Sequence, residues 1–258
     1  MSSDAKITFI VPTIGRASLI AALESITNQT CSDWKAIVVF DGVSPTIIIN
    51  DDRFQILHIE KVERLPNQIN SAGYVRNYGI QFATTEWVGF VDDDDVIKNT
   101  YVETFLQETA KYENDVVIFR MMKFQKYTIQ IKRLFELKDQ HNAKIHDAEY
   151  KLYQTMDPET FIMINTTTPF PTKHATNIME DDVGISFVAK KHIFDSGIQF
   201  NTHYKEDFEF IDTVQKNGYK IMISPFILYF IKHYEEFTDY ECNRVFLNHS
   251  VVVVPPRE

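Results

Sequence analysis

Four short apolar runs, with helix patterns between some of them, constrain the fold of this chain most strongly. The runs lack polar alternation, which is typical of strands buried on both faces of a sheet; they are Ile7–Val11, Ala36–Phe40, Phe54–Ile59 and Trp87–Val91. Residues 17–28 place apolar side chains on one helical stripe, and residues 73–84 and 100–112 are two further helix candidates. Strand, helix and strand in this order predict an α/β fold with a parallel sheet and right-handed crossovers.

The second half of the chain is less regular. After a strand candidate at residues 115–119, the stretch 136–182 is polar and irregular, which suggests an insertion that faces the substrate. Regular patterns then return: a strand candidate at 184–189, a helix candidate at 207–216 and an apolar run at 219–231. The tail VVVVPPRE is a short β-prone strip, expected to serve either packing or a homodimer contact. The length of 258 residues suits one domain.

Composition excludes several classes of protein. A formal charge of −10 argues against a nucleic-acid partner, because such proteins usually carry a basic face. The two cysteines, Cys31 and Cys242, are far apart and match neither a disulfide framework nor a zinc site. No apolar run approaches the roughly 20 residues of a membrane span. We therefore expect a soluble, cytoplasmic protein with no integral membrane segment.

Polar residues follow three of the predicted strands. Ligands of α/β sheets bind beyond the carboxyl ends of the strands, so Pro12-Thr13, Asp41-Gly42 and the run Asp92–Asp95 should meet at one edge. Four adjacent acids fit a helix cap with a solvated turn, since Asp favours both. They fit equally a divalent cation, Mg²⁺ or Mn²⁺, which prefers oxygen ligands and would allow a diphosphate to bind to this acidic chain.

Three stretches give the chain a family resemblance: VPTIGRASLIAALESITNQT, VVFDG and GYVRNYGIQFATTEWVGFVDDDDVI. In this order they resemble the family 2 glycosyltransferases with the GT-A fold, over residues 7–97. The resemblance implies a single α/β domain of GT-A type across residues 1–258, with a central, mostly parallel nucleotide-binding sheet flanked by helices. Residues 1–97 would then form the nucleotide-sugar-binding half, and residues 98–258 the acceptor-binding half.

The resemblance also implies a donor site, formed by Pro12, Thr13, Arg16, Asp41, Arg76 and Asn77. Thr13 and Asp41 would border the base and ribose of the nucleotide sugar, and Pro12 would shape the wall. Arg76 and Asn77 would lie close to the donor. For Arg76 an ion pair that steadies the acidic edge is the alternative, and Arg16 either aids the donor or solvates the start of a helix.

The aspartate run matches the DXD motif of the same family. Asp92 would touch ribose or metal, and Asp94 would bind the Mn²⁺ or Mg²⁺ ion that bridges the two phosphates. Asp93 is the middle position of the donor-site motif. His233 follows a long apolar run, where the family often carries a histidine that completes the metal shell; a structural histidine is the alternative.

A second acidic site is expected at a helix start. Inverting transfer needs a base for the acceptor hydroxyl, which typically contributes 10²–10⁴-fold. The family resemblance implies that Asp207 is this catalytic base and Glu206 its helper. The alternative is a structural role, in which Asp207 caps the N-terminus of the helix. The rival source of the base is a second acidic stretch, formed by Glu180, Asp181 and Asp182.

These features together predict a metal-dependent, inverting glycosyltransferase. It would move one sugar from a nucleotide-sugar donor, UDP-linked by expectation, to a hydroxyl of a glycan or other acceptor. No segment of the type QxxRW is present, so a processive synthase is not expected. A nucleotidyltransferase is one alternative, although the loop VPTIGRAS lacks the glycine-rich basic pattern of that class. A non-catalytic carbohydrate-binding or nucleotide-sugar-binding module on the same fold is the other.

Overall fold

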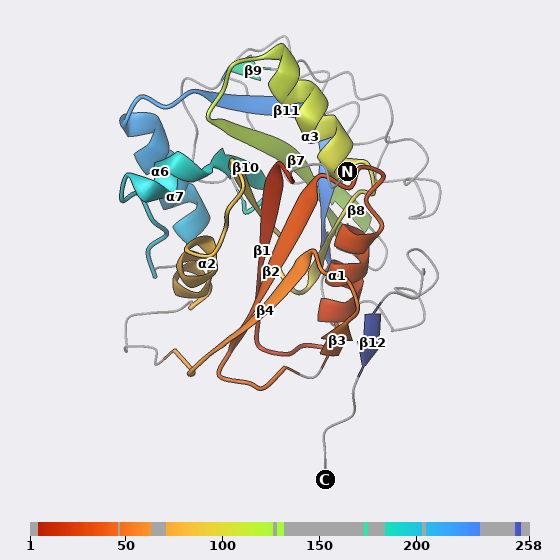
Figure 1. Cartoon of the computed structure of the whole chain (residues 1–258). Coiled ribbons are helices and arrows are strands. Elements are labelled where there is room, and N and C mark those ends of the chain that lie inside the picture. The colour runs from red at the N-terminus through yellow and green to blue at the C-terminus, as the bar shows by residue number, and fades with distance from the viewer. Residues whose placement is uncertain are drawn as a thin grey trace.

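Strands from both halves of the sequence build this protein (Figure 1). The computed structural model describes residues 5–45, 47–62, 71–125, 128–131, 173–174, 184–202, 205–232 and 251–253. The first half contributes β1 (Ile7–Thr13), β2 (Trp34–Asp41), β3 (Ile47–Ile49), β4 (Phe54–Ile59), β5 (Trp87–Phe90) and β6 (Asp95–Ile97). The second half contributes β7 (Val116–Gln125), β8 (Thr128–Ile131), β9 (Lys173–His174), β10 (Phe187–Lys190), β11 (Ile221–Lys232) and β12 (Val251–Val253).

The described ranges contain α1 (Leu19–Thr27), α2 (Ala72–Ile80), α3 (Tyr101–Lys111), α6 (Lys191–Asp195) and α7 (Glu206–Lys216). All of these except the short helix α6 lie close to the expected positions. In α1 the buried apolar positions recur at the helical spacing, at Leu19, Leu23 and Ile26. The predicted helices at 17–28, 73–84, 100–112 and 207–216 are therefore confirmed, with ends that differ by a few residues.

Within the described residues, ten strands form one mixed sheet. Its order is β4-β2-β1-β5-β10-β7-β11-β6, with β8 beside β7 and β9 beside β11. The four strands β4, β2, β1 and β5 run parallel to one another, as predicted. β10 is antiparallel to both β5 and β7, and β6 is antiparallel to β11. The parallel part comes from the first half of the chain, and the mixed part comes mainly from the second.

Two crossover helices cover opposite faces of the parallel part. The chain leaves β1 through α1 to β2 on one side, and leaves β4 through α2 to β5 on the other side of β1. Right-handed crossovers in opposite directions place the helices on opposite faces, as Figure 1 shows. α2 packs tightly on the sheet at Gly79, where a Cβ would lie 2.8 Å from Ile10 Cγ2 and 3.0 Å from Val39 Cγ2. This close packing fixes the height of α2 above β1 and β2.

One of the four predicted strands differs from its expected environment. β1, β2 and β5 are buried along almost their whole length, as their uninterrupted apolar sequence predicts. β4 is half-buried, with Gln55 and His58 exposed. β4 is the edge strand of the sheet next to β2, so its other side has no strand neighbour among the described residues. The prediction of burial on both faces was wrong for this edge strand.

An aromatic cluster holds α7 against the sheet. Phe210 on α7 stacks on Phe200 at 4.7 Å between ring centroids, and on Phe187 of β10 at 5.4 Å. Phe90, at the end of β5, meets Phe200 edge-on at 5.1 Å. Aromatic pairs of this kind contribute about 0.5–1.5 kcal/mol each beyond their buried area. The cluster therefore fixes the start of α7 beside the end of β5.

The tail strand packs within the chain. β12 pairs antiparallel with β3, which confirms the first of the two expected roles of the tail, packing.

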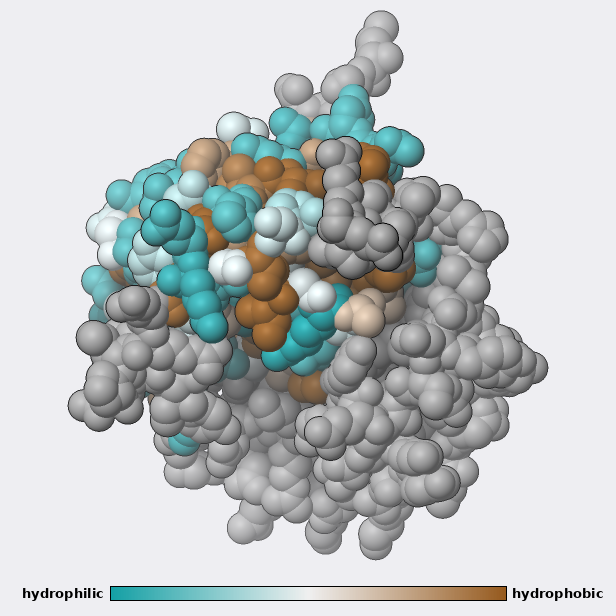
Figure 2. Space-filling model, turned by 90° about the horizontal axis from the view of Figure 1, so that it is seen from below, coloured by the Kyte–Doolittle hydropathy of each residue, from teal (hydrophilic) through white to brown (hydrophobic). Residues whose placement is uncertain are grey.

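The described surface is mixed in polarity. Seen from below, apolar and polar residues lie side by side on the same face (Figure 2). Among the described helices, none combines the length and apolar character needed to cross a bilayer.

Candidate functional site

A cavity of about 250 Å³ lies beyond the carboxyl ends of β1, β2 and β5. Its lining includes the predicted donor residues Pro12, Thr13, Arg16, Asp41 and Arg76. It also includes the acids Asp92, Asp93, Asp94 and Glu206. The prediction that three strand ends meet at one edge is thus confirmed. Five carboxylates and two guanidinium groups line this space, so its formal charge is negative and suits a cation.

The loop after β1 is fastened to the middle of the aspartate run. Thr13 Oγ1 donates to Asp93 Oδ2 at 2.7 Å and accepts from the Gly15 backbone N–H at 2.9 Å. Gly15 has a φ of +81°, a conformation that glycine adopts without steric cost. Arg16 Nη1 then lies 2.9 Å from Asp93 Oδ1 and 2.9 Å from Asp94 Oδ2. Asp93 therefore anchors the loop that forms one wall of the cavity.

Asp41, the last residue of β2, is buried and lines the cavity on the strand next to β1. Its Oδ1 accepts from the Val62 backbone N–H at 2.9 Å. Its Oδ2 accepts from the Ser71 hydroxyl at 3.0 Å. Ser71 and Ala72, which also line the cavity, were not predicted, because small residues at a helix start carry no distinctive sequence pattern. One carboxylate therefore ties the end of β2 to the start of α2.

Arg76 joins the two acidic segments. Its Nη2 lies 2.5 Å from Asp92 Oδ1, and its Nη1 lies 2.7 Å from Glu206 Oε1. Only 3% of its side chain is exposed. Burial by itself would lower the pKa of Arg76, but the charges of Asp92 and Glu206 outweigh burial and raise it. The guanidinium is therefore a permanent charge inside the site, as the ion-pair alternative anticipated.

The four aspartates occupy different environments. Asp93 and Asp95 are buried, whereas the side chains of Asp92 and Asp94 are about one-third exposed. Burial raises the pKa of Asp93, and the Thr13 hydrogen bond and the Arg16 charge only reduce this effect. Burial, and next the charge of Asp92, raise the pKa of Asp94. Crowding of like charges at this edge is thus incompletely compensated by the protein itself.

Three of these acids could hold a metal ion. One carboxylate oxygen from each of Asp92, Asp94 and Asp95 lies within 4.8 Å of the others. An oxygen set of this kind fits Mg²⁺ or Mn²⁺. Asp95 was not assigned by sequence, because it follows the DXD triplet. Its neighbour Tyr229 on β11 is fully buried, and burial, followed by the charge of Asp95, raises the pKa of the Tyr229 hydroxyl.

The two acids at the start of α7, Glu206 and Asp207, make different contacts. Glu206 is buried, lines the cavity and pairs with Arg76. Asp207 is half-buried and is not among the residues that line the cavity. Its Oδ1 accepts from the Phe208 backbone N–H at 2.8 Å, and its Oδ2 faces Gly184, where an added Cβ would lie 3.7 Å away. The Asp207 side chain therefore lies near the chain that precedes β10.

The sequence matches a known family over much of its length. The profile of the family described as glycosyl transferase family 2 matches residues 8–182, which is more than half of the chain. The chain belongs to glycosyl transferase family 2. The predicted family is thereby confirmed, and the matched range extends well beyond the residues 7–97 that carried the resemblance.

Curated relatives of this family 2 chain come from several bacteria. EpsH of Bacillus subtilis, named as a glycosyltransferase, is 41% identical over 103 residues, or 37% of this chain and 27% of EpsH. The glycosyltransferase GlyG of Streptococcus pneumoniae is 29% identical over 43% of this chain and 38% of its own. WcaA of Escherichia coli, named for colanic acid biosynthesis, is 24% identical over 81% of this chain and 85% of its own. The chain thus spans well under half of the first two relatives.

Solved structures confirm the fold class of this family 2 chain. TarS of S. aureus, residues 1–349 in complex with UDP, superposes with a TM-score of 0.59 and 17% identity over 93% of this chain and 64% of that one. The complex of the same TarS fragment with UDP-GlcNAc gives a TM-score of 0.61 and 16% identity over 94% of this chain and 62% of that one. At this identity the likeness shows the fold: one α/β domain of GT-A type with a mixed sheet and flanking helices.

One predicted donor residue of this family 2 site has another contact. Asn77 does not line the cavity. Its amide donates to the Phe200 carbonyl at 2.7 Å and accepts from the Phe200 N–H at 3.0 Å. The amide therefore fastens α2 to the chain before α7, and its expected place close to the donor stays a prediction. A helix pattern alone shows which face a residue occupies, but not what packs there.

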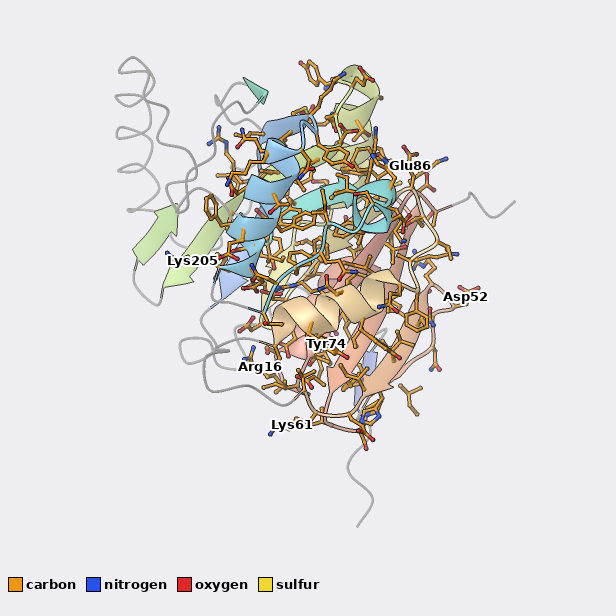
Figure 3. The ribbon with its side chains drawn as sticks, turned by 90° about the vertical axis from the view of Figure 1, so that its left-hand side faces the viewer. Arg16, Asp52, Lys61, Tyr74, Glu86 and Lys205 are labelled. Atoms are coloured by element: carbon orange, nitrogen blue, oxygen red, sulfur yellow. The ribbon has the colours of Figure 1, made fainter. Side chains whose placement is uncertain are left out.

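Other predicted site residues lie outside the described part of the chain. These are the metal-ligand candidate His233 and the rival acids Glu180, Asp181 and Asp182. The labelled side chains Arg16 and Tyr74, the latter in the first turn of α2, lie on one side of the molecule, and Asp52 lies on another (Figure 3). The cavity residue Arg16 therefore lies on the same side of the molecule as the start of α2.

Proposed function

We propose that this chain is a metal-dependent, inverting glycosyltransferase that moves one sugar from a UDP-linked donor to a hydroxyl of a glycan or other acceptor. The observation that carries the proposal is the cavity at the ends of β1, β2 and β5, which Asp92 and Asp94 line; their carboxylate oxygens lie within 4.8 Å of each other and of an oxygen of Asp95. Membership of glycosyl transferase family 2 supports the reaction class. The UDP and UDP-GlcNAc complexes of the structurally similar TarS support the donor class.

The walls of the cavity would bind the nucleotide. Asp41 and Thr13 border it at the ends of adjacent parallel strands, and Pro12 lies before Thr13 in the same wall. We assign Asp41 to the base or ribose, because its carboxylate is buried and its position is fixed by Val62 and Ser71. Hydrogen bonds of charged groups give strong selectivity in such a site. Residues 1–97 thus supply most of the donor contacts in this proposal.

The aspartate edge would hold the cation. Asp92 and Asp94 have partly exposed carboxylates, so we assign them as ligands, with Asp95 as a further candidate and His233 retained as the proposed fourth. A bound Mn²⁺ or Mg²⁺ would neutralise charge that develops on the departing nucleoside diphosphate. Arg16 pairs with Asp94 and is 43% exposed, so its charge is available near the same diphosphate.

The start of α7 would supply the base. The acceptor hydroxyl proton passes to the Asp207 carboxylate while the acceptor oxygen bonds to the anomeric carbon. The bond from that carbon to the diphosphate oxygen breaks, and the nucleoside diphosphate leaves with the electron pair. Attack from the opposite face inverts the anomeric centre, and no covalent enzyme intermediate is needed. We assign this base to Asp207, because Glu206 is buried and its Oε1 is held by Arg76.

Calorimetry and product analysis test the proposal together. UDP-, GDP- and dTDP-sugars are titrated with Mn²⁺ and again with EDTA, and release of nucleoside diphosphate is then followed with candidate hydroxyl acceptors. Cation-dependent binding with transfer, and an inverted anomeric configuration in the product, is the expected result. Binding without turnover on any acceptor would favour the non-catalytic module. Pyrophosphate release from a nucleoside triphosphate would favour the nucleotidyltransferase. Retention of configuration would refute inversion.

A further inference from the structure

One face of α2 is fastened to the chain that leads into α7. Residues three and four apart share a helix face, and Gly73, Arg76 and Asn77 have this spacing. A Cβ at Gly73 would lie 2.0 Å from the Asn201 carbonyl oxygen, so only glycine allows this approach. Asn77 exchanges two hydrogen bonds with the backbone of Phe200. The same face therefore docks on the residues before α7 at two points, and Arg76 lies between them.

Arg76 extends this contact in both directions. Its Nη1 reaches Glu206, the first residue of α7, and its Nη2 reaches Asp92, the first residue after Val91 beyond β5. The guanidinium carbon also lies 5.6 Å from the centroid of the Phe200 ring. The Nε is buried and has no hydrogen-bond partner among the described residues. The two Nη groups therefore make the ionic contacts, one to each acidic segment.

Asp92 belongs to two groups at once. Its Oδ1 accepts a hydrogen bond from Arg76 Nη2, and one of its oxygens lies within 4.8 Å of an oxygen of Asp94 and of an oxygen of Asp95. A cation on Asp92 would compete with Arg76 for the carboxylate charge. Ion pairs in a buried site interact strongly, because water screens them little. A change at the cation edge must therefore alter how firmly Arg76 holds Glu206.

We propose that Arg76 is a positioning residue that couples cation binding at Asp92 to the placement of Glu206 and the start of α7. The proposal rests on the proposed function, since it concerns the donor edge and the base of the same reaction. When a cation binds at Asp92, the ion pair between Arg76 and Glu206 becomes stronger. This pair holds the adjacent Asp207 in place for the acceptor. Only a planar, two-pronged group can serve both acids, and Arg has this shape whereas Lys does not.

A double-mutant cycle on Mn²⁺ affinity tests the coupling. Calorimetry measures the Kd of Mn²⁺ in the presence of UDP for the wild type, Glu206→Gln, Arg76→Gln and the double variant. With Arg76 present, Glu206→Gln should raise the Kd of Mn²⁺ about fivefold, because Arg76 then pairs with Asp92 alone. With Gln at position 76, the same substitution should raise the Kd less than about twofold. The matched control is Arg53→Gln. Arg53 also pairs with an acid, Asp51, and lies over a ring, but away from the cavity.

The outcomes separate this inference from the proposed function. An equal effect of Glu206→Gln in both backgrounds overturns the coupling, and so does loss of the effect in the Arg53→Gln background. A wild-type chain that binds no Mn²⁺ with any nucleotide overturns the proposed function, and the coupling with it. Normal wild-type binding with an additive cycle overturns the coupling alone.

A second variant keeps the test open if Arg76→Gln does not fold. Arg76→Lys retains the buried charge but cannot reach both acids as a fork. Its kcat should fall about tenfold or more, while the KM for the donor stays within about threefold. Partial recovery of kcat in Arg76→Ala on addition of guanidinium, but not of ammonium, is expected for the same reason. A kcat of Arg76→Lys equal to that of the wild type overturns the proposal.

Discussion

The two acidic segments of the site, Asp92–Asp95 and Glu206–Asp207, contain the same kind of side chain in different surroundings. Each has a buried acid that pairs with an arginine: Asp93 with Arg16, and Glu206 with Arg76. Each also has a neighbouring acid that is more exposed. They differ in crowding, since four acids follow one strand and only two begin the helix.

That difference separates two kinds of chemistry. At the strand end, burial raises the pKa of Asp93 and Asp94, and the charge of Asp92 adds to the effect. Such a cluster gains from a divalent cation, which compensates several carboxylates together. At the helix start, Arg76 already compensates Glu206, whereas Asp207 is half-buried with its Oδ2 near Gly184. We assign the proton of the acceptor hydroxyl to Asp207 in the proposed function. The two proposed roles of the same residue type thus follow from different neighbours.

The largest expected effect is at the helix start. Asp207→Ala should lower kcat by about 10²–10⁴-fold, because it removes the proposed proton acceptor. Affinity for the donor with Mn²⁺ should stay within about twofold, since Asp207 does not line the cavity. Steady-state kinetics and calorimetry measure the two quantities. Asp212→Ala, an exposed-pair residue on the same helix, is the control. An equal loss of donor binding would remove the distinction between the segments.

The next effect is at the strand end. Asp94→Ala should weaken cation-dependent donor binding by about 100-fold, or about 2.7 kcal/mol, because a partly exposed ligand of the proposed ion is lost. Calorimetry with Mn²⁺ and UDP, repeated with EDTA, measures it. The control is Asp52→Ala, because Asp52 is exposed and distant from the site (Figure 3). Donor binding that is unchanged and insensitive to EDTA would contradict the proposed metal role.

A smaller effect, on stability, distinguishes Asp93, which anchors the loop after β1, from Asp94, the proposed metal ligand. Asp93→Ala should lower the free energy of unfolding by about 1–3 kcal/mol, because it leaves Thr13 and Arg16 without their buried acceptor. Asp94→Ala should cost less than about 1 kcal/mol, since its pair with Arg16 is partly exposed. Urea denaturation without metal measures both. The reverse order would show that Asp94, and not Asp93, holds the loop.

The smallest effect concerns an acid–arginine pair outside the site. The hydrogen bond from Arg53 lowers the pKa of Asp51 below its usual value of 3.8. A lowered acid pKa stabilises the fold above the unfolded-state value and this contribution disappears as the pH falls through the folded value. Asp51→Asn should therefore lower the free energy of unfolding by less than about 1 kcal/mol near neutral pH. Urea denaturation between about pH 7 and pH 3 should show the difference shrinking. A difference that grows on acidification would contradict this sign.

Sequence reasoning predicted most of the strands and helices that build the site, because buried strands have uninterrupted apolar runs and helices have periodic ones. It did not predict β6, which begins at Asp95. It also predicted that Thr13, Asp41 and Asp92 share one edge, because parallel strands bring their carboxyl ends together. It did not predict that Asn77 binds the backbone of Phe200, or that Tyr229 lies beside the aspartates. Those contacts join residues more than 120 positions apart, and no local pattern encodes them.

The sequence by itself determined that acids follow buried strands and open a helix, since strand burial and helix periodicity are local properties of the chain. Tertiary structure alone decided which acid is buried and which is open. The reason is physical: the energy of a carboxylate depends on the charges and water around it, and these come from distant segments such as Arg16, Arg76 and β11. The order of residues supplied the groups, and packing assigned each its environment.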